Sequence, residues 1–298
     1  MSRYFVGTAG WSYQDWEGIV YPSKKSSSFH PLPFLAHYLN LVEINSTFYR
    51  IPSIRISLSW IKKIKDHPDF LFTVKLHQVF THQRKDFSQK DVDDFKLGIE
   101  PLRAKNRLAA ILLQFPWSFV NTTQNWDYLA NLFGHFSHFP LALEVRHSSW
   151  DVPSFYDLLS EHRVSFCNID QPLFRNSIKP STAATNPALS YVRLHGQNYE
   201  KWFQKDAGRD ERYNYFYTKK ELQPWVERIK NLSDKSEKVC VVTNNHYRGQ
   251  AFANALQIKN MLTREKFDIP SSLVERYPVL QEIIDQLKKG QLNLFTKS

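Results

Sequence analysis

Residues 41–53 read LVEINSTFYRIPS. The stretch begins as a short apolar run typical of a buried strand, yet it places the carboxylate of Glu43 between Val42 and Ile44. Because burying an unpaired carboxylate is costly, such a group is usually paired with a cation, bound to a metal or shifted in pKa. The same pattern, an apolar run that carries or ends in polar groups, recurs along the chain and predicts the fold.

Short β-branched or aromatic runs alternate with segments of helical periodicity. The strand-like runs are RYFVGTAG (3–10), NLVEIN (40–45), FLFTVKL (70–76), LAAILLQF (108–115), LALEVR (141–146), VSFCNID (164–170), SYVRLHG (190–196) and KVCVVTNN (238–245). Helical segments are expected at 29–40, 53–67, 90–106, 125–136, 153–163, 219–232 and 249–263. This alternation predicts an α/β fold, a single (β/α)8 TIM-type barrel with a C-terminal helical tail.

An open doubly wound sheet is the chief alternative fold. It usually carries a glycine-rich phosphate turn after its first strand, which GTAGW (7–11) matches poorly. We expect the barrel to occupy residues 1–265 and a C-terminal helix and tail to occupy 266–298. Segment 171–189 contains prolines and small polar residues, so it predicts a loop in the sixth crossover.

Composition limits the class of protein. The chain has 298 residues, of which 42% are hydrophobic and 15% aromatic, enough for a large globular core. Its formal charge of +10 favours anionic partners, although it can also serve solubility alone. Cys167 and Cys240 lie in apolar runs, which predicts free buried thiols. No signal-peptide pattern or membrane-length apolar run is present, so we expect a cytoplasmic protein with no membrane partner.

The predicted strands end in polar side chains, and barrels carry their chemistry at the C-terminal ends of their strands. Strand side chains alternate, so Arg193 and His195 share a face. We predict a shared polar ring at the barrel mouth, with catalytic candidates Glu43, Glu144, Asp170 and His195. The alternative is that pairs such as Glu144 with Arg146, or Glu43 with Lys75, are structural ion pairs.

The four catalytic candidates are also ligand types that hold divalent metal ions. Lys75, Arg146 and Arg193 at neighbouring strand ends would repel a cation and suit a phosphate or another anion better. We therefore expect no metal or other cofactor, with a divalent ion as the alternative.

Aromatic residues are frequent in the segments that follow the strands. They occur in GWSYQDWEGIVYP (10–22), which contains Trp11, and in STFYRIP (46–52), SSW (148–150) and NYEKWFQKDAGRDERYNYFY (198–217). Rings interleaved with arginine and lysine provide stacking faces for bases or sugars and cations for phosphates. The alternative is that these loops pack over the barrel as satellite apolar clusters.

Ordered motifs along most of the chain resemble those of a known family. They are GTAGWSYQDWEGIVYP (7–22), VEINSTFYRIPS (42–53), FTVKLHQVFTH (72–82), LLQFPWSF (112–119), LEVRHSSW (143–150), NIDQP (168–172), YVRLHG (191–196) and TNNHYRGQAFANA (243–255). Together they resemble the YecE-like family, also called domain of unknown function 72, from about residue 4 to about residue 262. The resemblance implies a TIM-type barrel without an established activity, often compared with phosphodiester-cleaving or sugar-isomerising barrels.

The resemblance also implies functional positions. The family's motif residues correspond here to Glu43, Asn45, Tyr49, Lys75, Glu144, Arg146, Asp170, Arg193, His195 and Asn245. Where relatives often read Arg-Asn after RLHG, this chain has Gln197 and Asn198, which puts one anion contact in doubt.

The C-terminal residues suggest a partner. QLNLF (291–295) resembles the Gln-Leu-x-Leu-Phe peptide by which bacterial repair and replication proteins dock on the sliding clamp. Leu294 and Phe295 would be apolar anchors, while Gln291 would hydrogen bond at the rim. The alternative is that Leu292, Leu294 and Phe295 pack back onto the barrel.

Two classes of function remain. In the first, an enzyme handles a phosphate-bearing substrate such as nucleic acid, by phosphodiester chemistry linked to DNA repair or replication. Lys75, Arg146 and Arg193 hold phosphate, Glu144 or Asp170 is the general base, and His195 donates a proton. Trp11, Asn45, Tyr49 and Asn245 complete the predicted ligand-binding set. In the second, the same groups form a non-catalytic nucleotide or nucleic-acid binding site; a sugar-type isomerase or hydrolase is a further alternative.

Overall fold

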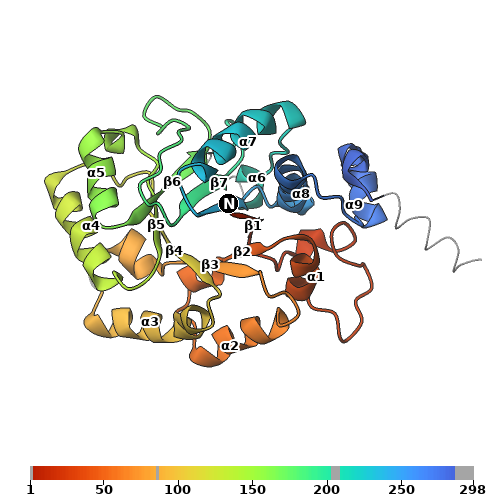
Figure 1. The fold of residues 1–298 in the computed structure, drawn as a ribbon, viewed down its shortest axis with the longest axis horizontal. Helices are drawn as coiled ribbons and strands as arrows, with labels where there is room; N and C mark the ends of the chain where they lie inside the picture. Colours follow the sequence, from red (N-terminus) through yellow and green to blue (C-terminus); the bar gives the residue numbers. More distant parts are fainter. Residues whose placement is uncertain (1–2, 85–86, 203–208, 286–298) are drawn as a thin grey trace, which may run out of the picture.

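The computed structural model describes residues 3–84, 87–202 and 209–285 and has the predicted closed barrel (Figure 1). Each strand pairs in parallel with the next along the chain, and β8 pairs with β1 to close the sheet. The strands are β1 (Arg3–Ala9), β2 (Leu41–Ile44), β3 (Leu71–Lys75), β4 (Leu108–Gln114), β5 (Leu141–Glu144), β6 (Val164–Asp170), β7 (Ser190–Leu194) and β8 (Lys238–Thr243). The expectation of a (β/α)8 TIM-type fold is confirmed.

Helices surround the strands in Figure 1. They are α1 (Pro31–Tyr38), α2 (Ile54–Lys63), α3 (Gln89–Ala104), α4 (Thr123–His135), α5 (Pro153–Glu161), α6 (Arg209–Arg212), α7 (Lys219–Ser233), α8 (Gln250–Thr263) and α9 (Ser271–Arg276). The residues before α2, α3, α4 and α7 are serine or threonine, and each side chain accepts a backbone N–H of the first turn. The seven predicted helical segments correspond to α1–α5, α7 and α8.

The connection between β6 and β7 contains no helix, as predicted for residues 171–189. Polar contacts hold this extended segment against β6. The Asn168 side chain accepts from Ser181 Oγ at 2.6 Å and donates to the carbonyl of Ala183 at 3.0 Å. Thr185 Oγ1 accepts the backbone N–H of Phe166 at 2.8 Å. Side-chain hydrogen bonds therefore replace helix packing along this part of the barrel.

The chain after α8 returns to the barrel. Leu273 and Leu280 are fully buried in one apolar cluster with residues of α1 and α8, and Phe267 forms an isolated β-bridge with Ile284. The described part of the C-terminal region is thus packed on the barrel. The predicted clamp-binding residues Gln291, Leu292, Leu294 and Phe295 lie outside the described residues.

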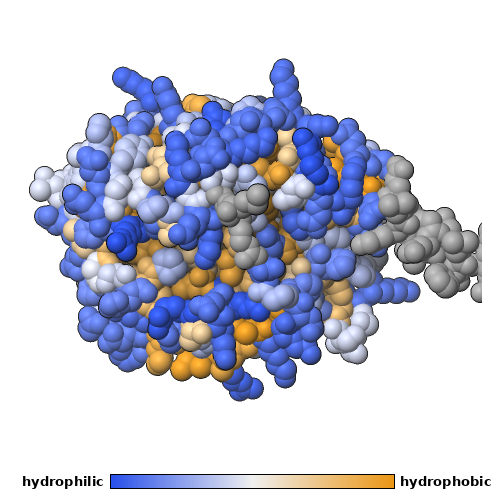
Figure 2. All heavy atoms as spheres, in the orientation of Figure 1, coloured by the Kyte–Doolittle hydropathy of each residue, from blue (hydrophilic) through white to orange (hydrophobic). Residues whose placement is uncertain are grey.

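The face shown in Figure 2 is largely hydrophilic, with apolar residues reaching the surface along its lower edge. Ile54 and Leu58 of α2 and Leu97 of α3 are among the exposed large apolar side chains. None of the helices in the described ranges combines the length and apolarity that crossing a membrane requires. Cys167 and Cys240 are buried free thiols, as predicted.

A candidate functional site at the barrel mouth

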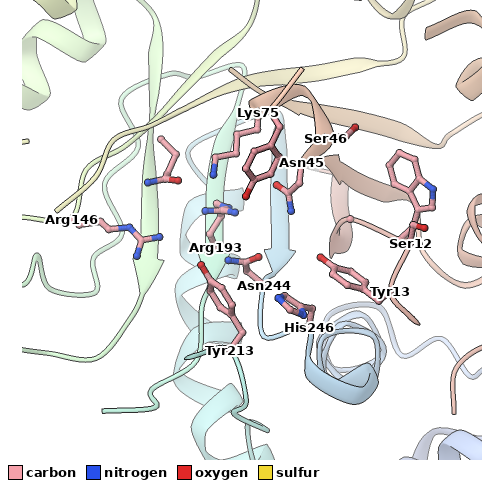
Figure 3. Close-up of a pocket in the computed structure, with 14 residues that line it drawn as sticks. Ser12, Tyr13, Asn45, Ser46, Lys75, Arg146, Arg193, Tyr213, Asn244 and His246 are labelled. Carbon is pink, nitrogen blue, oxygen red and sulfur yellow. The ribbon is translucent and has the colours of Figure 1, made fainter. Parts of the chain in front are cut away.

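A cavity of about 380 Å³ lies where the barrel strands end (Figure 3). Its walls come from strand ends and from the loops that follow them. The lining residues are Gly10, Trp11, Ser12, Tyr13, Asn45, Ser46, Tyr49, Lys75, Gln114, Arg146, Arg193, Tyr213, Asn244 and His246. This end of the barrel is where TIM-type proteins carry their active sites.

Arg193 of β7 forms the floor of the cavity and is held between two carboxylates. Its Nη2 lies 2.6 Å from Glu43 Oε1, and its Nη1 lies 2.5 Å from Glu144 Oε2. Both glutamates are fully buried. The Tyr191 hydroxyl lies 3.0 Å from the second oxygen of Glu43 and 2.8 Å from Thr73 Oγ1. Arg193 is therefore the counter-charge that neutralises the buried Glu43 carboxylate from across the barrel.

Glu144 binds three neighbours. Besides Arg193, its Oε1 lies 2.9 Å from Arg146 Nη2 and 3.2 Å from His195 Nε2. Burial opposes its ionisation, but the attraction of Arg193, His195 and Arg146 prevails and holds the pKa of Glu144 well below its usual value. An ionised carboxylate with its lone pairs so engaged orients the two arginines and is poorly suited to accept a proton.

His195 lies beneath the cavity and is neutral at physiological pH. Burial, together with the charges of Arg146 and Arg193, lowers its pKa to about 3 despite the opposing effect of Glu144. The Asn244 amide nitrogen lies 3.0 Å from Nδ1, which fixes that nitrogen as the acceptor and Nε2–H as the donor to Glu144. His195 therefore orients Glu144 and is sealed from the cavity.

Lys75, by contrast, lines the cavity at the end of β3. Its Nζ stands 4.1 Å from the centre of the Phe48 ring and forms no ion pair with any described residue. Burial and the charge of Arg193 lower the pKa of Lys75 to about 7, against the opposing effects of Glu43 and Glu144. Lys75 is thus a partly protonated amine at neutral pH that faces open space.

The charge and hydrogen-bonding state of the cavity favour an anion. Arg146 and Arg193 are cationic, Lys75 is partly protonated, and none of the lining residues in the described part of the chain is acidic. Two buried polar atoms, Asn45 Oδ1 and Arg193 Nε, have no hydrogen-bond partner among the described residues. Figure 3 shows Lys75, Asn45 and Asn244 directed toward the region of the Arg193 guanidinium, with Arg146 at one side.

The aromatic side chains of these loops divide between the cavity wall and the interior of the protein. Trp11, Tyr49 and Tyr213 line the cavity, and Tyr13 stacks on His246 with ring centres 4.6 Å apart. Trp16 and Trp150, however, are fully buried and donate their indole N–H groups to backbone carbonyls. Only part of the aromatic content is therefore available to a ligand.

The predicted ligand-binding residues are largely brought together. Six of the seven line the cavity, namely Trp11, Asn45, Tyr49, Lys75, Arg146 and Arg193. Asn245 points elsewhere, because its amide donates to Tyr215 O and to Asn254 Oδ1, both at 2.8 Å. Its neighbours Asn244 and His246 line the cavity instead, along with Tyr13 and Tyr213 of the aromatic loops.

The predicted catalytic residues divide into two groups. Glu43, Glu144 and His195 meet beneath the cavity floor, each fully buried. Asp170 instead accepts from the Tyr217 hydroxyl and from Gln197 Nε2 at 2.9 Å, and burial raises its pKa. The expectation that all four share one solvent-reachable cup is corrected accordingly.

The structure also separates the metal-ligand set considered from sequence, because Asp170 is bound elsewhere and Glu144 is occupied by arginines. Within the described ranges no group of three or more histidine, cysteine or acidic side chains is arranged to hold a metal ion.

The sequence and fold have recognisable relatives. A family model described as "Protein of unknown function DUF72" matches residues 5–277. UPF0759 protein YunF of Bacillus subtilis is 32% identical over 278 residues, covering 88% of this chain and 95% of that protein. UPF0759 protein YecE of Escherichia coli is 29% identical over 146 residues, 48% of each chain. The crystal structure of a DUF72 family protein from Thermotoga maritima, 37% identical, superimposes with a TM-score of 0.76 over 87% of this chain and 98% of that chain.

Proposed function

The chain belongs to the DUF72 family of proteins of unknown function, and we propose that its barrel mouth binds a phosphate-bearing compound and acts on it by acid–base chemistry at Lys75. The observation that carries the proposal is the charge of the lining, in which two arginines and a partly protonated lysine face a cavity without a described acidic residue. Such a lining raises the local concentration of anions and strengthens their binding in a partly dry site.

Arg146 is the best-placed phosphate ligand. Glu144 fixes its guanidinium from one side through Nε and Nη2, while the side chain keeps 12% of its surface exposed at the cavity. A planar guanidinium held in place matches the geometry of phosphate oxygens and loses little entropy on binding. Arg193 Nε adds a donor that has no hydrogen-bond partner among the described residues.

Lys75 is better suited to proton transfer than the groups named from sequence. Glu144 and His195 are sealed under the floor and engaged with one another. Lys75 reaches the cavity, and its pKa of about 7 allows it to accept or donate a proton at physiological pH. The buried glutamates then act as positioning residues for the arginines.

The size of the cavity favours a small ligand. A volume of about 380 Å³ lies toward the lower end of the range for ligand pockets, which fits a sugar phosphate or one nucleotide unit. Trp11, Tyr49 and Tyr213 provide ring faces for a sugar or base. If the ligand is nucleic acid, one nucleotide unit would enter the cavity, and the rest of the strand would lie over the cavity rim.

Calorimetric titration with inorganic phosphate, ribose 5-phosphate, a nucleoside monophosphate and a short single-stranded DNA tests the proposal. We expect Arg146→Gln to weaken the best ligand about tenfold or more. Arg55→Gln, on the exposed surface of α2, is the matched control and should bind like the wild type. Absence of binding by all four compounds, or equal loss in both variants, would overturn the proposal.

A non-catalytic binding protein is the competing function, and turnover separates the two. Incubation with the tightest ligand, followed by product analysis, should show conversion by the wild type and none by Lys75→Met, which should still bind. Binding without conversion in the wild type would support the non-catalytic function.

A further inference from the structure

We propose that Lys75 forms an imine with its substrate, which makes the substrate class a phosphate-bearing aldehyde or ketone. The inference rests on the proposed phosphate site and adds the chemical nature of the second group that the ligand must carry.

Lys75 lacks the carboxylate partner that several other described lysines have. Lys25, Lys90, Lys219, Lys230 and Lys259 each pair with a carboxylate. Lys75 has an aromatic ring at 4.1 Å and no ion-pair partner among the described residues. Burial and the nearby charge of Arg193 favour the neutral, nucleophilic form of this amine, against the attraction of Glu43 and Glu144.

The carboxylates near Lys75 are already engaged. Glu43 and Glu144 are the acidic groups that act on it, and both are bound to Arg193. Arg193 and Arg146 oppose a positive charge on Lys75. His82, in the helical turn that follows β3, has its pKa lowered to about 4 by burial and by the charges of Lys75, Arg146 and Arg84. The nearby carboxylates therefore do not fully offset the cost of a positive charge on Lys75.

The position of Lys75 also suits a substrate anchored by phosphate. Figure 3 shows Lys75 and Arg146 entering the same cavity from different strand ends, with Arg193 between them. A phosphate on Arg146 would leave the rest of a small molecule directed into the space that Lys75 faces. Holding a carbonyl carbon near the amine in this way makes the attack effectively intramolecular.

The proposed step balances without a further reactant. The lone pair of Lys75 Nζ forms a bond to the carbonyl carbon, while the C=O π electrons move to oxygen and a proton passes from nitrogen to oxygen. The resulting carbinolamine then loses its hydroxyl together with the remaining N–H proton as one water molecule. What remains is a C=N bond between substrate and lysine, and hydrolysis reverses the sequence.

Pyridoxal 5′-phosphate is a suitable probe because it carries both an aldehyde and a phosphate. The intact chain would be mixed with a near-equimolar amount at pH 7.5 and reduced with borohydride, whose hydride converts the C=N bond to a stable secondary amine. Peptide mass spectrometry then locates the label. We expect labelling at Lys75 to exceed that at any exposed lysine at least tenfold, and Lys75→Arg to abolish it.

Arg146→Gln and inorganic phosphate link the label to the anion site. Each should reduce labelling of Lys75 severalfold, whereas Arg55→Gln should leave it unchanged. Labelling of Lys75 at the rate of exposed lysines, or labelling that Arg146→Gln leaves unchanged, overturns the inference. If phosphate binds by calorimetry while Lys75 stays unlabelled, the imine fails and the proposed phosphate site stands. If phosphate neither binds nor competes, the proposed function fails as well.

Discussion

Arg193 of β7 and Glu43 of β2 meet across the interior of the barrel, with Nη2 and Oε1 2.6 Å apart and both side chains withdrawn from solvent. The other amino group of the same guanidinium binds Glu144 of β5. Three strands that are not sequence neighbours are therefore joined by one buried cation. Such a pair adds little stability over an apolar core, but loss of one partner leaves an uncompensated charge in a medium of low dielectric.

This arrangement predicts a large cost for removing one carboxylate. Glu144→Gln should lower the free energy of unfolding by about 3–5 kcal/mol, because Arg193 and Arg146 would lose their shared counter-charge. Urea unfolding followed by circular dichroism measures the change. The control is Glu17→Gln, which breaks the exposed pair with Lys25 and should cost at most about 1 kcal/mol. Equal costs for the two variants would contradict this account of the cluster.

Lys75 should behave in the opposite way. Its pKa is about 7 in the folded chain against 10.5 for an ordinary lysine, so folding is penalised by a fixed amount below pH 7 and the penalty vanishes as the pH rises toward 10.5. Lys75→Met should therefore stabilise the protein by about 2–4 kcal/mol at pH 6.5 and by distinctly less at pH 9.5.

Urea unfolding at both pH values measures the gain, with Lys90→Met on the exposed face of α3 as the control. A stabilising substitution at a cavity residue is the signature of a group retained for function. Destabilisation by Lys75→Met at both pH values would show instead that the amine serves the fold.

The alternation of apolar runs and helical segments was sufficient to predict the barrel. The runs were readable because strands of a parallel barrel are buried on both faces, as all seven residues of β6 are. Because both faces of such a strand are buried, the sequence does not show which of its residues point into the barrel. Asn168 and Asp170 lie on the same face of β6. Asn168 hydrogen bonds to the segment at 181–183, so the Asp170 side chain also points away from the cavity, where it accepts from Tyr217.

Strand 8 shows a second limit of sequence reasoning. Asn244, Asn245 and His246 follow its last residue, where the chain turns and the two-residue alternation no longer applies. Asn245 hydrogen bonds to the buried Asn254 of α8 and so points away from the cavity. Its neighbour Asn244 contacts His195, and His246 stacks on Tyr13. These contacts join positions far apart in the sequence and depend on the fold itself.

His195 makes stability depend on pH in a defined direction. Its pKa is about 3 in the folded chain and near 6.5 when unfolded, so between these values the unfolded chain binds one more proton. Acidification from pH 7 to pH 5 thus favours unfolding. His195→Gln should reduce the stability lost over this interval by about 2 kcal/mol, because the linked proton is removed.

Urea midpoints at pH 7, 6 and 5 measure the effect of His195→Gln. His138→Gln, at an exposed position after α4, is the control. A pH profile for His195→Gln that parallels the wild type would mean that the ring is already charged in the folded state.

The sequence QLNLF at 291–295 gives the last prediction, in which the C-terminus docks on the bacterial sliding clamp. The packed part of the chain extends at least to Ile284, which is 4% exposed, and Asp285 donates its backbone N–H to Phe267. Deleting residues 291–298 should therefore abolish co-purification with the clamp while the melting temperature stays within about 1 °C, because the deletion removes no residue of the described apolar core. Replacing Leu294 and Phe295 with alanine should have the same effect, and Lys297→Ala should have none, because the apolar anchors supply most of the binding energy. A melting temperature lowered by several degrees on deletion would show that these residues instead pack onto the barrel, and retention of the clamp by the alanine variant would exclude them as its anchors.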